Sequence, residues 1–200
     1  MHDLAAGVTH FQRDVFPVKA DLFARLATTH RPDTLFIGCS DARVVPELIT
    51  NSEPGDLFVI RTAGNLVPVH TRGADGVAAS IEFAIAVLGV SRIVVCGHSG
   101  CGAMTAVAER HDLSGTPAIA EWLGHVDATD TPATGAEPDD RVSMLVRSNV
   151  VAQLANLSTH PSVSGAVDAG TVTVEGWVFD IGTGAVTVFD AAGSEAAPAA

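Results

Sequence analysis

The chain has 200 residues, which fits one domain with room for a substantial core. Its composition, with 47% hydrophobic and 17% charged residues, is that of a globular protein and excludes a largely disordered one. The formal net charge of −12, from 11 Lys+Arg and 23 Asp+Glu, argues against nucleic acid or an anionic membrane surface as a partner.

The first residues contain no basic segment followed by an apolar one, so we expect no signal peptide. No apolar run is long enough to span a bilayer. Three cysteines do not make a disulfide framework, and in a chain without an export signal they fit metal binding or catalysis. We therefore expect a cytoplasmic protein that does not insert into a membrane.

Predicted helices and strands alternate along the chain. Residues 2–29 are expected to form two amphipathic helices with a break between Phe16 and Pro17. Apolar, β-branched runs predict strands at residues 33–38, 56–61, 91–97, 171–180 and 185–190. Further helices are predicted at residues 46–49, 75–88, from 100 onward, 116–126 and 141–157, with an acidic loop at 127–140.

This alternation predicts an α/β fold, with a mostly parallel central sheet and flanking helices. The turn residues at 181–184 predict a hairpin, which gives the sheet an antiparallel C-terminal edge. We expect residues 1–190 to form a single domain that begins with a helical arm at 1–30. Residues 191–200, which are small and polar, are expected to be a frayed tail.

Two short segments carry the chemistry. Cys39, Asp41 and Arg43 follow the first predicted strand, and His98 and Cys101 follow the third. If these two strands are neighbours in a parallel sheet, their carboxyl ends bring both segments to the same edge, where α/β proteins bind ligands. Two thiolates and one imidazole would then make a three-ligand zinc site with an open fourth position, as in catalytic zinc centres.

Asp41 and Arg43 lie at the same edge and suggest a second role there, beside metal binding. A solvated ion pair in a loop contributes little. However, a carboxylate two residues from a metal ligand would compete for the metal unless something held it away. A guanidinium can do so through two parallel hydrogen bonds. Asp41 would then accept a hydrogen bond from a zinc-bound hydroxide and orient it towards the substrate.

The remaining cysteine and most of the other histidines have no sequence feature that indicates metal binding or catalysis. Cys96 lies in the middle of a predicted strand and is expected to be a buried, inert thiol. No histidine other than His98 is spaced from a cysteine in the same way. Six of them are therefore expected to be solvated or structural: His2, His10, His70, His111, His125 and His160.

The chain resembles the β-class carbonic anhydrases, zinc enzymes that hydrate carbon dioxide to bicarbonate and a proton. The resemblance covers roughly residues 20–190 and rests on more than the metal-binding residues. The matching segments are LFIGCSD at residues 35–41, VPEL at 45–48, EPGDLF at 53–58, RTAGN at 61–65, IVVCGHSGCG at 93–102 and EGWVFD at 175–180.

The resemblance implies one zinc ion per subunit, with Cys39, His98 and Cys101 as ligands and Asp41 as a fourth ligand in a closed form. Arg43 would pair with Asp41 in the open form. The pocket for carbon dioxide or bicarbonate would comprise the amide of Gly102, an apolar wall and His30, which stands where the family commonly has a glutamine. The apolar wall would consist of Phe58, Ala63 and Phe83, completed across the interface of a homodimer or larger homo-oligomer.

Other functions remain open at this stage. The same fold and metal could act on carbonyl sulfide or carbon disulfide. A zinc or redox sensor, in which Cys39 and Cys101 exchange metal for a disulfide, leaves the pairing of Asp41 with Arg43 unexplained. A phosphatase would need more room between Cys39 and Arg43, and a zinc deaminase would need a glutamate where Gly100 stands.

Overall fold

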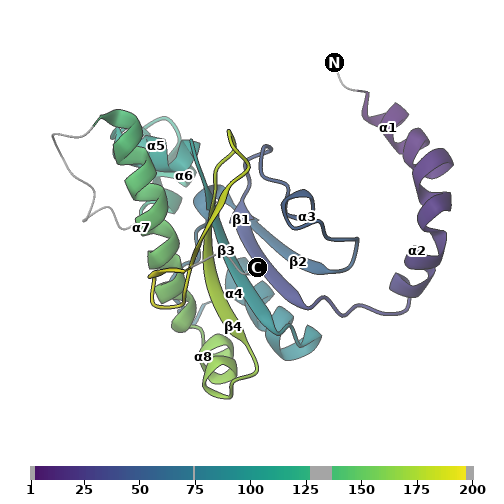
Figure 1. Ribbon diagram of the computed structural model, residues 1–200. Helices are drawn as coiled ribbons and strands as arrows, with labels where there is room; N and C mark the ends of the chain where they lie inside the picture. Colours follow the sequence, from purple (N-terminus) through teal and green to yellow (C-terminus); the bar gives the residue numbers. More distant parts are fainter. Residues whose placement is uncertain (1–2, 74, 127–136, 197–200) are drawn as a thin grey trace. The chain divides into compact units, whose positions relative to one another are not determined.

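The computed structural model describes residues 3–73, 75–126 and 137–196 (Figure 1). The chain divides into two units, Met1–Arg31 and Pro32–Ala200. The first unit is a helical arm whose winding changes along its length, and it buries none of its helical residues. It consists of α1 (Leu4–His10), a π-helical segment η1 (Phe11–Val15), a 3₁₀ segment η2 (Phe16–Lys19) and α2 (Ala20–Leu26).

The change of winding falls where the sequence predicts a break. Pro17 has no N–H to donate to the preceding turn, so a regular α-helix cannot continue through it. At the start of the arm, the Asp3 carboxylate caps α1 by accepting hydrogen bonds from the amides of Ala5 and Ala6 at 3.0 and 3.2 Å.

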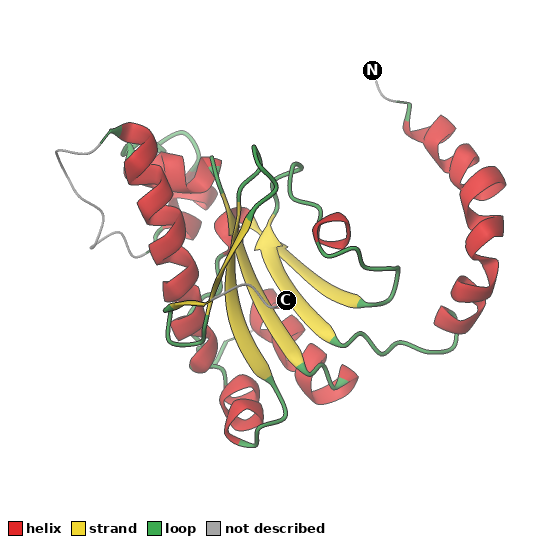
Figure 2. Ribbon diagram, in the orientation of Figure 1, coloured by secondary structure: helices red, strands yellow, loops and turns green. Residues whose placement is uncertain are grey.

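The second unit is built on one six-stranded sheet, in the order β2-β1-β3-β4-β5-β6 (Figure 2). The pairs β1–β2, β1–β3 and β3–β4 are parallel, whereas β4–β5 and β5–β6 are antiparallel. The predicted mostly parallel sheet with an antiparallel C-terminal edge is therefore confirmed. The strands are β1 (Thr34–Cys39), β2 (Leu57–Thr62), β3 (Arg92–His98), β4 (Thr173–Phe179), β5 (Val186–Phe189) and β6 (Glu195–Ala196).

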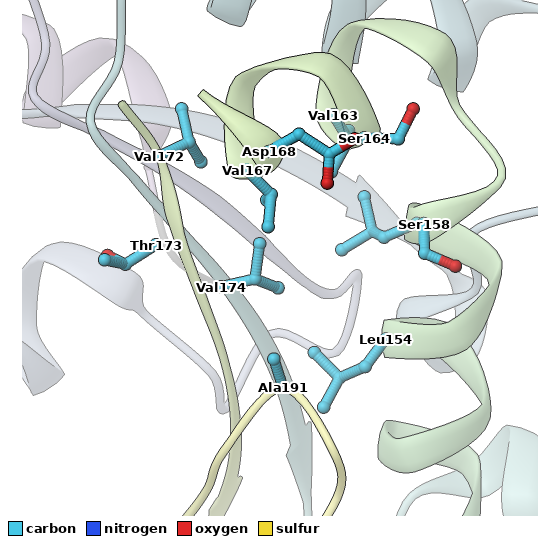
Figure 3. A pocket seen from close by; sticks show the side chains of 11 residues that line it. Leu154, Ser158, Val163, Ser164, Val167, Asp168, Val172, Thr173, Val174 and Ala191 are labelled. Carbon is cyan, nitrogen blue, oxygen red and sulfur yellow. The ribbon is translucent and has the colours of Figure 1, made fainter. Parts of the chain in front are cut away.

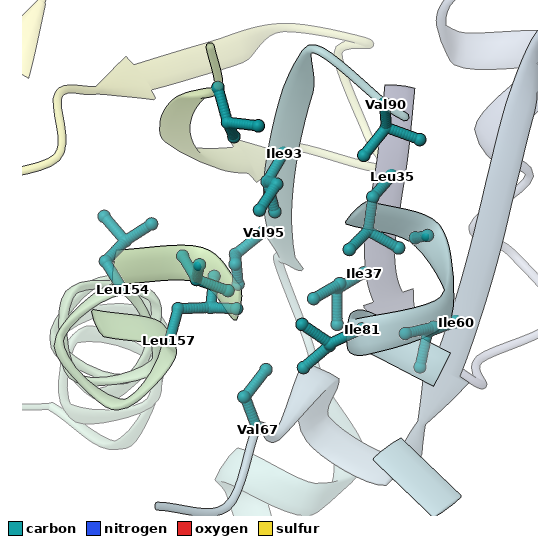
Figure 4. Close-up of a cluster of buried hydrophobic side chains, with 13 residues drawn as sticks. Leu35, Ile37, Ile60, Val67, Ile81, Val90, Ile93, Val95, Leu154 and Leu157 are labelled. Atoms are coloured by element: carbon teal, nitrogen blue, oxygen red, sulfur yellow. The ribbon is translucent and has the colours of Figure 1, made fainter. Parts of the chain in front are cut away.

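Side chains of the strands alternate between two faces, with the period of two that a pleated strand requires. Leu35 and Ile37 of β1 and Ile93 and Val95 of β3 belong to one core cluster with residues of helices that cover this face (Figure 4). The alternate positions, including Phe36 and Val94, form a second cluster on the opposite face. The helices and 3₁₀ or π segments of this unit are α3 (Pro46–Ile49), η3 (Ala63–Asn65), α4 (Gly76–Glu82), η4 (Phe83–Leu88), α5 (Gly102–Ala108), α6 (Pro117–Leu123), α7 (Pro138–Ser158) and α8 (Pro161–Asp168).

Two details of the helices differ from the expectations. Helix α7 begins at Pro138 rather than at residue 141, because proline suits a first turn and Asp139 and Asp140 complement the helix dipole there. The rest of the expected acidic loop, residues 127–136, lies outside the described residues. Helix α8 is not predicted, since Pro161 is taken as a stop signal when it in fact occupies the first turn of a new helix.

The C-terminal tail also differs from its expectation. Residues 195 and 196 pair with β5 as the short strand β6, after a turn in which the amide of Gly193 donates to the carbonyl of Asp190. Gly193 adopts a φ of 80°, which glycine tolerates without strain. Of the expected frayed segment, residues 197–200 lie outside the described part of the chain.

Helix α7 approaches the sheet closely because glycines lie beneath it. A Cβ atom added to Gly176 of β4 would lie 2.6 Å from Cγ1 of Val150 and 3.0 Å from Cδ1 of Leu154. On β3, a Cβ atom at Gly97 would lie 2.8 Å from Cγ2 of Val150. The close contact between α7 and the sheet thus depends on the absence of side chains at these two positions.

We expect Gly176→Ala to lower the free energy of unfolding by about 1–3 kcal/mol, because the added methyl group overpacks the contact with α7. Gly165→Ala in α8 is the control, since nothing lies within 4 Å of its added Cβ and alanine favours a helix by about 1 kcal/mol. Urea unfolding of both variants measures the difference. Equal stability of the two variants would contradict the packing argument.

Candidate metal centre and active site

The carboxyl ends of β1 and β3 carry the two chemically informative segments. Because β1 and β3 are paired in parallel, Cys39 at the end of β1 and His98 at the end of β3 lie at the same edge of the sheet. Cys101 is the residue that precedes the first turn of α5. One ligand atom from each of these three buried residues lies within 4.8 Å of the other two, as expected for a metal site.

The donor set fits a zinc ion. The sulfurs of Cys39 and Cys101 are 4.0 Å apart, far beyond a disulfide bond and close to the roughly 3.8 Å between two thiolates on a tetrahedral zinc. His98 is fully buried, and its Nε2 has no hydrogen-bond partner among the described residues. A buried nitrogen without a partner is costly unless something else, such as a metal, satisfies it.

A backbone carbonyl orients the imidazole of His98. Its Nδ1 lies 3.0 Å from the carbonyl oxygen of Ser99, which places the proton on Nδ1 and leaves the lone pair on Nε2. Ser99 is itself held in place, because its amide donates to the carbonyl of Phe179 and its hydroxyl accepts from the amide of Ile181, both at 2.9 Å. The hairpin after β4 therefore supports the histidine through one intervening residue.

The three cysteines have different ionisation properties. Cys39 and Cys101 share a hydrogen bond between their sulfurs, which lowers the pKa of Cys39 to about 4 and raises the pKa of Cys101. Burial raises the pKa of Cys96 to about 12, so that thiol stays protonated and inert. These properties distinguish the pair at the strand ends from the cysteine in the middle of β3.

Asp41 and Arg43 form a bidentate pair next to this group. Arg43 donates from Nε to Oδ1 of Asp41 at 2.9 Å and from Nη2 to Oδ2 at 2.7 Å, and its amide also donates to Oδ1 at 2.9 Å. These bonds hold the pKa of Asp41 well below its usual range. Oδ2 of Asp41 lies 3.8 Å from Nε2 of His98, so the ionised carboxylate lies beside the histidine donor.

Two arginines fix the loops that carry these groups. Nη2 of Arg43 donates to the carbonyl of Gly100 at 3.0 Å, which connects the two segments. Arg61 donates to the carbonyl of Cys39 from Nε and Nη2, at 3.0 and 2.7 Å, and to the carbonyl of Asp41 at 2.6 Å. Charge-assisted hydrogen bonds of this kind hold the loop after β1 in one conformation.

Comparison with known proteins identifies the family. The family model described as "Carbonic anhydrase" matches residues 34–186. A carbonic anhydrase from Pseudomonas aeruginosa is 51% identical over 195 residues, covering 96% of this chain and 89% of that protein. The chain belongs to the carbonic anhydrase family.

The solved structures place it in the β class. The structure of the β-carbonic anhydrase CcaA superposes with a TM-score of 0.91 and 36% identity, covering 98% of this chain and 91% of the other. A structure described as one of two tetrameric β-carbonic anhydrases from Sordaria macrospora superposes with a TM-score of 0.76 and 32% identity, covering 97% and 94%. The family resemblance noted in the sequence is therefore confirmed, and β-carbonic anhydrases use zinc.

The predicted pocket residues of this β-class chain do not all lie together. Gly102 is the first residue of α5, directly after Cys101, and Ala63 follows the end of β2. Phe58 and Phe83 contact one another, with ring centroids 6.0 Å apart. On β2, the residue paired with Cys39 is Thr62. Phe58 comes four residues before Thr62, which places it about 13 Å away along the strand.

His30 belongs to the unit Met1–Arg31, so its role at the site stays a prediction. An apolar pocket of about 430 Å³ lies between α7, α8 and β4 and is lined by residues such as Leu154, Val167 and Val174 (Figure 3). It contains none of the predicted site residues, and we assign it no part in the chemistry.

Several residues that support the site are not found by sequence reasoning alone. Arg61 and Ser99 support the site through hydrogen bonds to backbone groups, and the sequence does not indicate which backbone groups are bound. Asn149, Gln153 and Asn156 of α7 are also missed, although their spacing of four and three residues places polar side chains on one face of the helix. A polar stripe of this kind, in a helix that packs on the sheet, indicates side chains that form buried hydrogen bonds.

We expect Cys101→Ser to reduce the zinc content of the purified protein to less than about a tenth of that of the wild type, because a hydroxyl is a poor substitute for a thiolate ligand. Cys96→Ser is the matched control, since Cys96 is equally buried but lies outside the three-residue group. Zinc analysis by atomic emission, with circular dichroism to check folding, measures both. Full zinc content in Cys101→Ser would contradict the assignment of the site.

Proposed function

We propose that this protein catalyses the reversible hydration of carbon dioxide to bicarbonate and a proton, with one zinc ion per subunit bound by Cys39, His98 and Cys101. One observation carries the proposal. Two sulfurs and an unpartnered imidazole nitrogen meet in a buried group, beside a carboxylate that a guanidinium keeps ionised. Membership of the carbonic anhydrase family supports the same reaction.

Zinc bound there would supply a Lewis acid that lowers the pKa of water, and two thiolate ligands would make it a milder Lewis acid than zinc held by three histidines. Asp41 accepts a hydrogen bond from the attacking water through a carboxylate oxygen, which directs an oxygen lone pair towards carbon dioxide. Arg43 holds both oxygens of Asp41, so the carboxylate stays ionised and cannot rotate freely. In a closed form Asp41 would leave Arg43 and become the fourth metal ligand.

We assign the substrate pocket to residues that suit a small apolar gas. Ala63, Phe58 and Phe83 would form its apolar wall, and the amide of Gly102 would hold a substrate oxygen. His30 would donate to bound bicarbonate. Since Phe58 lies about 13 Å along β2 from the register partner of Cys39 and Phe83 packs against Phe58, we propose that both serve the active site of a second copy.

Exposed apolar side chains support a homodimer or a larger homo-oligomer. Leu4 and Val8 of α1 are 76% and 56% exposed, and Phe11 lies on the same side of the helix three residues later. A helical arm with such a stripe fits against another subunit, and one of the similar structures is described as tetrameric. We therefore propose that the arm embraces the neighbouring copy.

Within the residues described, no helix is both long and apolar enough to cross a bilayer. All three cysteines are free thiols. We propose a reducing compartment, the cytoplasm, since free thiols persist there.

We expect Asp41→Asn to lower kcat/KM for carbon dioxide hydration by about 100-fold or more, because the amide cannot replace an ionised hydrogen-bond acceptor. Zinc content should not change. Asp14→Asn is the control, because Arg13 holds Asp14 in a similar bidentate pair in the arm. Stopped-flow hydration assays on zinc-loaded protein measure the effect, and undiminished turnover in Asp41→Asn would rule out its proposed role.

We expect Val8→Glu to shift the protein towards the monomer and to lower activity in parallel, because it places a charge in the apolar stripe of α1. Thr9→Glu is the control, since Thr9 is the next residue and points to a different side of the helix. Sedimentation velocity at several concentrations measures the assembly. An unchanged oligomer in Val8→Glu would argue against the arm as a subunit contact.

A further inference from the structure

Only two residues separate the metal-binding residues His98 and Cys101. His98 is the last residue of β3 and Cys101 precedes the first turn of α5, so Ser99 and Gly100 form the whole connection between them. Gly100 adopts a φ of 60°, which glycine tolerates without strain. Because the connection is this short, the contacts of Ser99 and Gly100 decide how the imidazole and the Cys101 sulfur stand relative to one another.

Ser99 forms hydrogen bonds through its carbonyl, its amide and its hydroxyl. The carbonyl oxygen lies 3.0 Å from Nδ1 of His98. The amide donates to the carbonyl of Phe179 at 2.9 Å, and the hydroxyl oxygen accepts from the amide of Ile181 at 2.9 Å. Phe179 is the last residue of β4, so Ser99 joins the histidine to the hairpin that follows this strand.

The hydroxyl of Ser99 occupies a position that a backbone carbonyl normally fills. The register pairs His98 with Phe179, so Ser99 would face Asp180 if the pairing of β3 with β4 continued. In a parallel ladder, a residue donates to the residue before its partner and accepts from the residue after it. The amide of Ser99 follows this rule, but the amide of Ile181 donates to the hydroxyl of Ser99 rather than to its carbonyl. The carbonyl is therefore left to the histidine.

The hairpin turn holds the amide of Ile181 in place. Oδ1 of Asp180 accepts from the amide of Thr183 at 2.7 Å and from its hydroxyl at 2.8 Å. The amide of Gly184 donates to the carbonyl of Asp180 at 2.8 Å. These bonds close the turn around Ile181, so its amide is a fixed donor that faces Ser99.

The orientation of His98 depends on the carbonyl that this arrangement leaves free. The ring is fully buried, and Nε2 has no hydrogen-bond partner among the described residues, so the contact of Nδ1 with the carbonyl of Ser99 fixes the ring. A hydrogen bond on Nδ1 selects the tautomer whose Nε2 carries the lone pair. Without the hydroxyl of Ser99, the amide of Ile181 would compete for the same carbonyl, because an unpaired backbone donor is costly.

We propose that Ser99 is a positioning residue of the metal centre: its hydroxyl satisfies the amide of Ile181, so that its carbonyl stays on Nδ1 of His98. The inference rests on the proposed function only in that it takes His98 as a zinc ligand. Loss of a hydrogen bond to the far side of a ligating imidazole typically lowers metal affinity by about 10- to 100-fold. A purely structural role for the hydroxyl would stabilise the contact of β3 with the hairpin without affecting the metal.

Ser99→Ala removes the hydroxyl, and Ser99→Thr keeps it. Thr159→Val is the matched control, because the hydroxyl of Thr159 also accepts from a backbone amide, that of His70 at 2.9 Å, at the end of α7. Each variant is loaded with Zn²⁺ to measure zinc release to a chelator, and with Co²⁺ to record proton NMR spectra. Cobalt shifts the Nδ1–H proton of a bound histidine far outside the usual range, and His98 is the one histidine of the three-residue group, so the signal assigns itself.

We expect the Nδ1–H proton of His98 to exchange with water about 10-fold faster or more in Ser99→Ala, because its acceptor is drawn towards the amide of Ile181. Zinc release should become about 10-fold faster or more. Ser99→Thr and Thr159→Val should match the wild type in both measurements. An unchanged proton signal and release rate in folded Ser99→Ala, or equal changes in Thr159→Val, would overturn the proposal.

A second comparison keeps the shape of the side chain constant and serves if Ser99→Ala does not fold. Ser99→Thr and Ser99→Val have nearly the same shape and differ in the hydroxyl, so changes confined to Ser99→Val support the proposal and equal changes in both overturn it. Failure of both Ser99→Ala and Ser99→Val to fold would assign the hydroxyl a purely structural role and overturn it as well. Neither measurement depends on carbon dioxide turnover, so failure of this proposal and failure of the proposed reaction can be told apart.

Discussion

The parallel pairing of β1 with β3 is the interaction on which the site depends. The register that aligns Phe36 with Val94 and Gly38 with Cys96 places the ends of the two strands together. Cys39 is the last residue of β1, His98 is the last residue of β3, and Cys101 follows three residues later. A single-residue shift in this register would move every side chain of one strand to the opposite face and would separate the donors. The buried side chains of both strands specify the register and therefore also specify the metal centre.

The main features of this centre could be predicted from the sequence, because its chemistry is local to two strand ends. Cysteine, histidine, aspartate and arginine stand in short segments after apolar, β-branched runs, and a parallel sheet brings such segments to one edge. The fold class follows from the same alternation of elements. Helix α8 could not be predicted in this way, since Pro161 is compatible with either the end of one helix or the start of another.

The supports of the centre could not be predicted to the same degree, because they act through the backbone. Arg61 binds the carbonyls of Cys39 and Asp41, and the ring of His98 binds that of Ser99. Backbone carbonyls are the same in every residue, so no residue type marks the receiving end of these bonds. The polar residues of α7 are an intermediate case: their helical spacing is visible in the sequence, but their partners appear only in the fold.

The arrangement of the polar groups distinguishes a hydrating enzyme from a zinc or redox sensor. A sensor needs two cysteines that can approach each other, and the two sulfurs here, which are 4.0 Å apart, meet that requirement. It has no use for a carboxylate held by two parallel hydrogen bonds or for a fixed imidazole tautomer. Each of these features restricts a group that must face an attacking water in a defined orientation. The restriction has a cost in conformational freedom, which catalysis explains and metal exchange does not.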